Sequence, residues 1–206
     1  MTSVGSADAG LGKDPATAPP FEETPPANLL LLGPSMEDDG DAIVRLLESV
    51  TGTPALLAVS LLRPPAERIA TWEERWRAPP AEVAAIGCTH AGTTPGESST
   101  ETPFRTTTVA DPGDLTGLGI RINECLDAWS NRDPVVVFDS VTTMLQYADT
   151  RQVFQFCHVL TSRMKRAGVM SVFYMDPEAH DEQTVSTIRS LFEGVYEWTE
   201  DGWEGV

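Results

Sequence analysis

The chain of 206 residues is long enough for one domain with a buried core, and 41% of its residues are hydrophobic. Asp and Glu number 31 against 14 Lys and Arg, which gives a formal net charge of -17 and argues against a nucleic-acid partner, because phosphate contacts need Lys and Arg. So acidic a surface, with only two lysines, favours a halophilic organism, where about 1 M salt shortens the Debye length to roughly 3 Å. An acidic protein from an ordinary cell is the alternative.

Apolar runs and cysteines bear on where the protein works. The longest apolar run, around residues 29–32, is too short to cross a bilayer, and no signal peptide is evident, so we expect no membrane association. The three cysteines, Cys88, Cys125 and Cys157, are odd in number and form no CxxC pair. They favour reduced thiols in a cytoplasmic protein over a disulfide framework or a zinc site.

Residues 1–27 are rich in Pro, Ala, Gly, Ser and Thr and have few large apolar side chains. Such a segment buries too little surface to offset its ordering entropy, so we predict a disordered tail before a single domain at 28–206. In that domain, short apolar segments typical of buried parallel strands are residues 28–32, 55–61, 83–86, 106–109, 135–138 and 169–174. Residues 195–203 predict a closing hairpin.

Between those segments, apolar residues recur at helical spacing. The four faces comprise Ile69, Trp72 and Trp76; Leu115, Leu118, Ile122, Leu126 and Trp129; Val153, Phe156, Cys157, Leu160 and Met164; and Val185, Ile188 and Phe192. Asp114 is placed to cap the second helix. Strands alternating with helices predict an α/β fold with a mainly parallel sheet and helices on both faces.

Such a sheet binds ligands beyond the carboxyl ends of its strands, and the first of these ends is followed by Gly33 and Pro34. A phosphate loop, GxxxxGK[ST], would begin there, since its backbone N–H groups, lysine and hydroxyl hold phosphates and Mg²⁺. Counted from Gly33, Asp38 replaces the second glycine, Asp39 the lysine and Gly40 the hydroxyl residue. The loop therefore lacks the side chains that phosphate binding requires.

Four carboxylates, Glu37, Asp38, Asp39 and Asp41, lie at the start of the helix predicted to follow. They complement the helix dipole and would repel a triphosphate. A metal site is the functional alternative. We favour a solvated, self-capped helix start, because no His or Cys is near them in the sequence.

The apolar segment at 135–138 ends in Asp139, which Ser140 and a further helical segment follow. An apolar strand ending in Asp is the Walker B pattern, in which the carboxylate orients Mg²⁺ and its water. In a domain without nucleotide, we expect this carboxylate to accept hydrogen bonds from Ser140, nearby backbone N–H groups or loop hydroxyls.

Residues 135–147, 151–166 and 169–174 resemble the core of RecA/KaiC-type ATPases, and residues 110–115, 138–140 and 176–183 resemble an uncharacterised haloarchaeal RecA-like group. The resemblance covers roughly residues 28–200. It implies a RecA-like, P-loop-NTPase-type sandwich, ATP binding in members with an intact loop, and an ATPase-type role for Asp139. The chain departs from that pattern in its loop, and again at residues 61–63, where KaiC-like members carry catalytic glutamates.

Two further groups could carry chemistry. His180, Asp181 and Glu182, with Asp176 upstream, could bind a metal or act as a base, but they equally predict capping of the next helix. Cys88 lies close to His90, although a buried structural cysteine is the interpretation that we favour.

The degenerate loop in an otherwise regular skeleton predicts a non-catalytic domain without a cofactor, which binds a protein partner or its own copies in regulation or signalling. The alternative is an unusual ATP-binding protein that works as a homo-oligomer, with Gly33, Asp139 and Ser140 at a nucleotide held with Mg²⁺. Hydrolase chemistry on His180 or Cys88 is a third hypothesis, which we favour least.

Overall fold

A computed structural model describes residues 27–34, 40–50, 52–88, 104–200 and 202–206. Almost all of the predicted tail at 1–27, and three of the four predicted loop carboxylates (Glu37, Asp38 and Asp39), lie outside these described residues.

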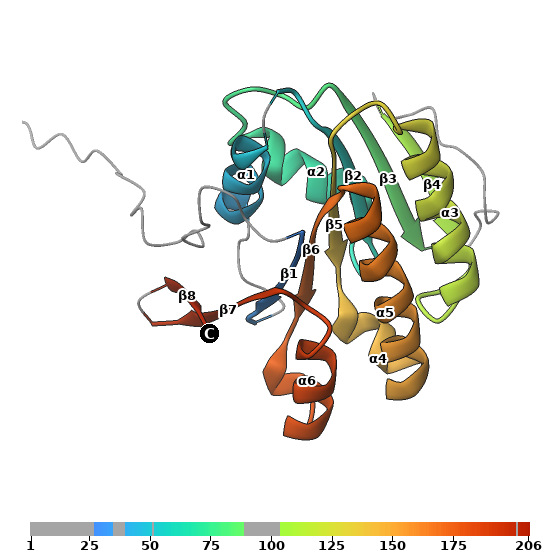
Figure 1. The fold of residues 1–206 in the computed structure, drawn as a ribbon, viewed down its shortest axis with the longest axis vertical. Helices are drawn as coiled ribbons and strands as arrows, with labels where there is room; N and C mark the ends of the chain where they lie inside the picture. The colour runs from blue at the N-terminus through green and yellow to red at the C-terminus, as the bar shows by residue number, and fades with distance from the viewer. Residues whose placement is uncertain (1–26, 35–39, 51, 89–103, 201) are drawn as a thin grey trace, which may run out of the picture.

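One mostly parallel sheet forms the centre of the molecule (Figure 1). In the described part of the chain its strand order is β4-β3-β2-β5-β6-β1-β7-β8, and only the hairpin of β7 and β8 is antiparallel. The strands are β1 (Asn28–Leu32), β2 (Ala55–Ser60), β3 (Glu82–Cys88), β4 (Arg105–Val109), β5 (Pro134–Asp139), β6 (Met170–Met175), β7 (Gly194–Thr199) and β8 (Gly202–Gly205). The predicted strands and the closing hairpin are confirmed.

Helices cover both faces of this sheet (Figure 1). They are α1 (Gly40–Ser49), α2 (Pro65–Glu73), α3 (Leu115–Ala128), α4 (Val141–Tyr147), α5 (Thr150–Ala167) and α6 (Glu182–Arg189), with a 3₁₀ turn, η2, at Pro177–Ala179. α1 and α2 pack on one face, and α3, α4, α5 and α6 pack on the other. The α/β prediction is confirmed, and the architecture is consistent with a RecA-like sandwich.

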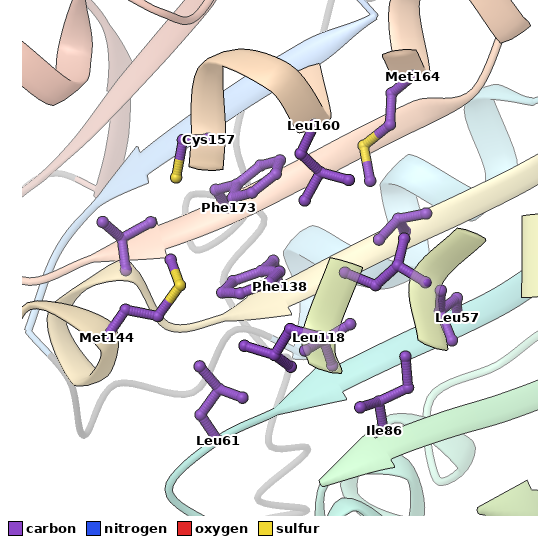
Figure 2. Packing of buried hydrophobic residues seen from close by; sticks show 14 of the residues in the cluster. Leu57, Leu61, Ile86, Leu118, Phe138, Met144, Cys157, Leu160, Met164 and Phe173 are labelled. Atoms are coloured by element: carbon purple, nitrogen blue, oxygen red, sulfur yellow. The ribbon is translucent and has the colours of Figure 1, made fainter. Parts of the chain in front are cut away.

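Alternate residues along the strands point to opposite faces of the sheet and pack into two separate cores. On the α5 side, Phe138 of β5 stacks on Phe173 of β6 with ring centroids 5.1 Å apart, and Leu118, Met144 and Leu160 close over them (Figure 2). Because helices cover both faces, β1 is buried at every position, which explains its unbroken run of leucines.

Strand β1 lies between β6 and β7, far from its neighbours in sequence. A buried polar residue, Asn28, fixes its first position: its side-chain Nδ2 donates to the Thr161 carbonyl oxygen at 3.2 Å, and Ser171 Oγ donates to its Oδ1 at 2.7 Å. Since a buried amide must find partners, these bonds favour one register for β1 against β6 and α5.

Three of the predicted helical faces include a residue that lies beyond the end of the observed helix. Trp76, Trp129 and Phe192 lie beyond the last residues of α2, α3 and α6. After α2, Pro79 and Pro80 disfavour further helix. Phe192 still reaches the core, where its ring meets that of Phe173 edge-on with centroids 5.1 Å apart. Packing, and not a place on the face of α6, explains why this residue is apolar.

Candidate functional site

The carboxyl end of β5 is the place where the sequence predicts ligand chemistry. Asp139 is the last residue of β5 and stands opposite Ser60, the last residue of β2. The backbone continues this pairing by one step, because the Leu61 N–H donates to the Asp139 carbonyl oxygen at 2.7 Å. The Asp139 side chain is therefore held at the end of two central strands.

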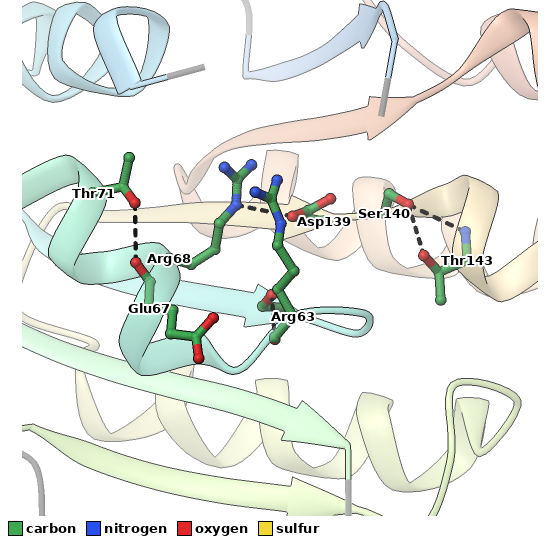
Figure 3. A network of polar contacts seen from close by, with 8 residues as sticks. Arg63, Glu67, Arg68, Thr71, Asp139, Ser140 and Thr143 are labelled. Carbon is green, nitrogen blue, oxygen red and sulfur yellow. Dashed lines mark hydrogen bonds and ion pairs between the residues drawn. The ribbon is translucent and has the colours of Figure 1, made fainter. Parts of the chain in front are cut away.

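A buried arginine faces that carboxylate (Figure 3). Arg68, on α2, donates from Nε to Asp139 Oδ2 at 2.9 Å, and the two side chains are only 4% and 16% exposed. The guanidinium carbon of Arg68 lies 5.4 Å from the ring centroid of Trp72 and 5.9 Å from that of Tyr174. Aromatic faces attract a cation, so this Arg68–Asp139 pair is stabilised from two sides.

Asp139 has a partner that the sequence did not indicate. We predicted donation from Ser140, nearby backbone N–H groups or loop hydroxyls, and an arginine 71 residues earlier in the chain donates to this carboxylate. A carboxylate cannot be left charged in a buried site without a partner, and a guanidinium satisfies both its charge and its hydrogen bonding. The only sequence signal was a basic residue beside Ile69 on the otherwise apolar face of α2.

Ser140 serves the next helix. Its hydroxyl accepts from the Thr143 N–H at 3.1 Å and lies 3.0 Å from Thr143 Oγ1, which makes Ser140 the N-cap of α4 (Figure 3). Such a cap supplies an acceptor to a backbone donor that the helix itself leaves open. Its role is therefore accounted for by local structure.

Gly33, the first residue of the expected phosphate loop, is closely packed. Its N–H donates to the Met175 carbonyl oxygen at 3.0 Å. A Cβ at this position would lie 3.0 Å from Trp203 Cη2 and 3.1 Å from Trp198 Cβ. These tryptophans face each other across the β7–β8 hairpin with centroids 5.4 Å apart. The hairpin thus favours glycine here, because a Cβ would be tightly packed, and the Gly33 N–H is engaged within the sheet.

The contacts of Asp139 and Gly33 disfavour Mg²⁺ with a nucleotide at these two residues. Magnesium takes oxygen ligands, whereas Asp139 Oδ2 faces a cation, and the Gly33 N–H already has an acceptor. Of the expected site residues, Gly33, Asp139 and Ser140 all lie at carboxyl ends of strands, but each is engaged in its own packing contact.

The His180 group follows β6. Thr142 Oγ1 accepts from the Asp176 N–H at 2.8 Å and lies 3.2 Å from His180 Nε2. Asp181 caps α6 by accepting from the Thr184 N–H at 2.8 Å, so the capping prediction is confirmed. Burial lowers the pKa of His180, although Asp176 and Asp181 act in the opposite direction. The neutral imidazole is favoured beside the threonine.

The cysteines are poor nucleophiles. Burial, with smaller contributions from Asp111 and Asp114, raises the pKa of Cys88 to about 11, and burial raises the pKa of Cys157 to about 12. Since the thiolate is the reactive form, these raised pKa values disfavour nucleophilic chemistry at neutral pH. His90 lies outside the described residues. Over the described ranges, no group of three or more His, Cys, Asp or Glu residues is arranged to hold a metal ion.

Two cavities lie away from Asp139. One of about 180 Å³ is at the amino ends of the strands, between the end of α1 and the segment from Trp76 to Pro80. The other, an open hollow of about 480 Å³, lies between α3 and α5, where Thr116, Gln152, Gln155 and Phe156 line it.

A family described as one of unknown function, DUF7504, matches residues 26–198, which is most of the chain. The chain belongs to the DUF7504 family. A comparison with curated proteins found no match.

This match overturns the resemblance to RecA/KaiC-type ATPases and to a haloarchaeal RecA-like group, because DUF7504 is the family found and nothing in the match indicates those ATPases. The segments that suggested them have a more general cause. Buried apolar strands and helices capped by Ser or Asp are general features of parallel α/β sheets. In this DUF7504 domain the Asp139 that ends β5 holds an arginine.

None of the helices in the described ranges combines the length and apolar character needed to cross a membrane.

Proposed function

We propose that this DUF7504 domain is non-catalytic and acts in regulation or signalling by binding another protein, in the cytoplasm of a halophilic archaeon. The observation that carries the proposal is the Arg68–Asp139 pair, which occupies the strand end where an α/β sheet would bind its ligand. An internal ion pair stabilised by Trp72 and Tyr174 serves the fold and engages the Asp139 carboxylate.

Two further observations support it. The Gly33 N–H is bonded within the sheet, and the tryptophan hairpin packs against the carboxyl end of β1. The cysteine thiols have raised pKa values that suit packing better than catalysis. ATP binding completed across a homo-oligomer depends on Asp139, and we favour it less because that carboxylate faces Arg68.

The test is titration calorimetry of the full chain with ATP and Mg²⁺ in molar KCl. We expect no binding tighter than about 1 mM, which corresponds to about -4 kcal/mol. Arg68→Met provides the matched comparison, since it removes the cation from Asp139 and leaves an apolar side chain of similar length. A micromolar dissociation constant in the wild-type chain that Asp139→Asn abolishes would show that the proposal is wrong.

A further inference from the structure

The outward face of α5 differs in charge from the rest of this acidic chain. Spacings of three and four residues align one set of side chains opposite the buried residues Val153, Cys157, Leu160 and Met164. This set, called the α5 stripe below, consists of Arg151, Gln155, His158, Val159, Ser162 and Arg166. Ser162 is half-buried and the other five are exposed.

The α5 stripe is cationic. Thr150–Ala167 contains no Asp or Glu, although the whole chain has 31 such residues. On the flanks of the helix, Arg163 pairs with Asp127 and Lys165 pairs with Glu193. Among the residues that the structure describes, no ion pair engages Arg151 or Arg166. The two ends of the stripe therefore present positive charge to solvent.

Arg151 is placed where folding gains nothing from its charge. It is the second residue of α5, at the end of the helix that carries partial positive charge. Asp149 already caps that end and forms a capping box with Gln152. A cation that the helix disfavours, in a chain with only 14 Lys and Arg, calls for a role outside the fold.

The middle of the stripe carries one exposed apolar side chain, Val159. Val159 is 66% exposed, and Ile120 of α3, 50% exposed, is a second uncovered apolar side chain on this side of the sheet. Val159 also borders the hollow of about 480 Å³ between α3 and α5, where Phe156 is half-buried. The stripe thus has an arginine at each end, Arg151 and Arg166, and between them the exposed Val159 beside the hollow.

We propose that the α5 stripe docks a helix of a partner protein that carries two carboxylates with an apolar side chain midway between them. Arg151 and Arg166 are fifteen residues apart, so their Cα atoms are separated by about 22 Å along the helix. A partner helix has the same rise and matches this spacing when its own carboxylates are fifteen residues apart. The inference rests on the proposed protein-binding function and specifies its surface and partner chemistry.

Charge complementarity selects an acidic partner helix. In molar salt the Debye length is about 3 Å, so attraction acts only at contact, through direct Arg–carboxylate pairs. The apolar contact at Val159 is not screened by salt. The direct Arg–carboxylate pairs and the apolar contact at Val159 together favour a helix with matched spacing over other acidic protein surfaces.

The probe is a synthetic, fluorescein-labelled helical peptide with glutamates fifteen residues apart and leucine midway, titrated with the full chain by fluorescence anisotropy in molar KCl. A second peptide has glutamine in place of both glutamates. We expect the glutamate peptide to bind about tenfold more tightly than the glutamine peptide, because each contact pair adds to the affinity. Equal affinities, or no binding of the glutamate peptide, would overturn the proposal.

Matched variants locate the binding surface. Arg151→Gln with Arg166→Gln should weaken the glutamate peptide about tenfold, whereas Arg77→Gln with Arg132→Gln, which removes the same charge elsewhere on the surface, should change affinity less than about twofold. Val159→Ser should weaken binding more than the same change at Leu62, which is 62% exposed. Equal effects of the paired variants would mean non-specific charge attraction and would overturn the proposal.

A second copy of the chain is the competing occupant. Sedimentation velocity of the wild-type chain and of the Arg151→Gln, Arg166→Gln variant distinguishes the two occupants. If the wild-type chain is a dimer and the variant is a monomer, a second copy occupies the stripe and the assignment to a partner protein is overturned. Nucleotide binding detected by calorimetry would refute the proposed function and would leave the peptide result unchanged. If the glutamate peptide does not bind, only the proposal that the α5 stripe is a docking surface is refuted.

Discussion

Arg68 is a buried cation, 4% exposed, whose charge faces the Asp139 carboxylate and two aromatic rings. Removing one member of such a pair leaves the other buried and unsatisfied. We expect Asp139→Ala to lower the free energy of unfolding by about 3 kcal/mol, as measured by urea denaturation in molar KCl. Replacing both residues by apolar ones, Arg68→Met with Asp139→Leu, should be milder than Asp139→Ala alone.

Asp127→Ala is the control for the Asp139 prediction, because Asp127 is 74% exposed in its pair with Arg163. A solvated pair of this kind contributes less than about 1 kcal/mol. If Asp139→Ala unfolds at the same urea concentration as wild type, the Arg68–Asp139 pair has no structural role.

The close contact at Gly33 gives a second prediction at this scale. Trp198 Cβ is held by the backbone and cannot yield to a methyl group 3.1 Å away, so Gly33→Ala should destabilise the chain by about 1–3 kcal/mol. Gly119→Ala is the opposite case. Its Cβ would lie 3.7 Å from Phe156, an ordinary contact, and alanine should stabilise α3 by up to about 1 kcal/mol. Thermal unfolding of the two variants should shift in opposite directions.

At the scale of elements, α5 has well-defined ends. Asp149 and Gln152 form its capping box, Gly168 ends it with a φ of 67°, and Lys165 and Arg166 lie in its last turn. Asp149→Ala should reduce the free energy of unfolding by about 1 kcal/mol. Arg151→Gln should instead raise it by a few tenths of a kcal/mol, because it removes a cation from the positive end of the helix.

Chemical denaturation of these two α5 variants measures whether each change lowers or raises the free energy of unfolding. Destabilisation by Arg151→Gln comparable to that by Asp149→Ala would mean that Arg151 supports the fold, which removes one reason for assigning it to a partner.

The elements themselves could be predicted from local pattern. Short apolar segments that are buried on both faces set the strands, and Asp114 and Asp181 cap the helices that their positions predict. Helix ends were predicted less well, since Trp76 and Phe192 are apolar for reasons of packing and not of helical period.

Contacts between distant elements could not be predicted. Nothing near Asp139 in the sequence indicates Arg68, because that pairing depends on how α2 crosses the end of β5. The pairing of β1 with β7, and the tryptophans that this brings against Gly33, likewise arise only when the sheet is assembled. The place of Asp139 at the end of a strand was predictable, whereas its partner Arg68 was not.

For the whole molecule, the net charge of -17 dominates. Carboxylate repulsion is screened as salt rises, since the Debye length falls from about 10 Å at 0.1 M to under about 3 Å at 2 M. We expect the melting temperature to rise with KCl over this range. A melting temperature that KCl does not change would contradict the proposed halophilic origin.

The place of β1 in the sheet has a consequence for biosynthesis. Its first residue, Asn28, pairs with Ser171, a separation of 143 residues, and its other neighbour, β7, comes later still. At about 5–20 residues per second, a ribosome needs roughly 7–30 s to supply those partners. Throughout that interval the nascent chain carries four consecutive leucines with no strand to receive them. We therefore expect chaperones to bind this segment during translation, because β1 is the first of the described strands to be made and among the last to be enclosed.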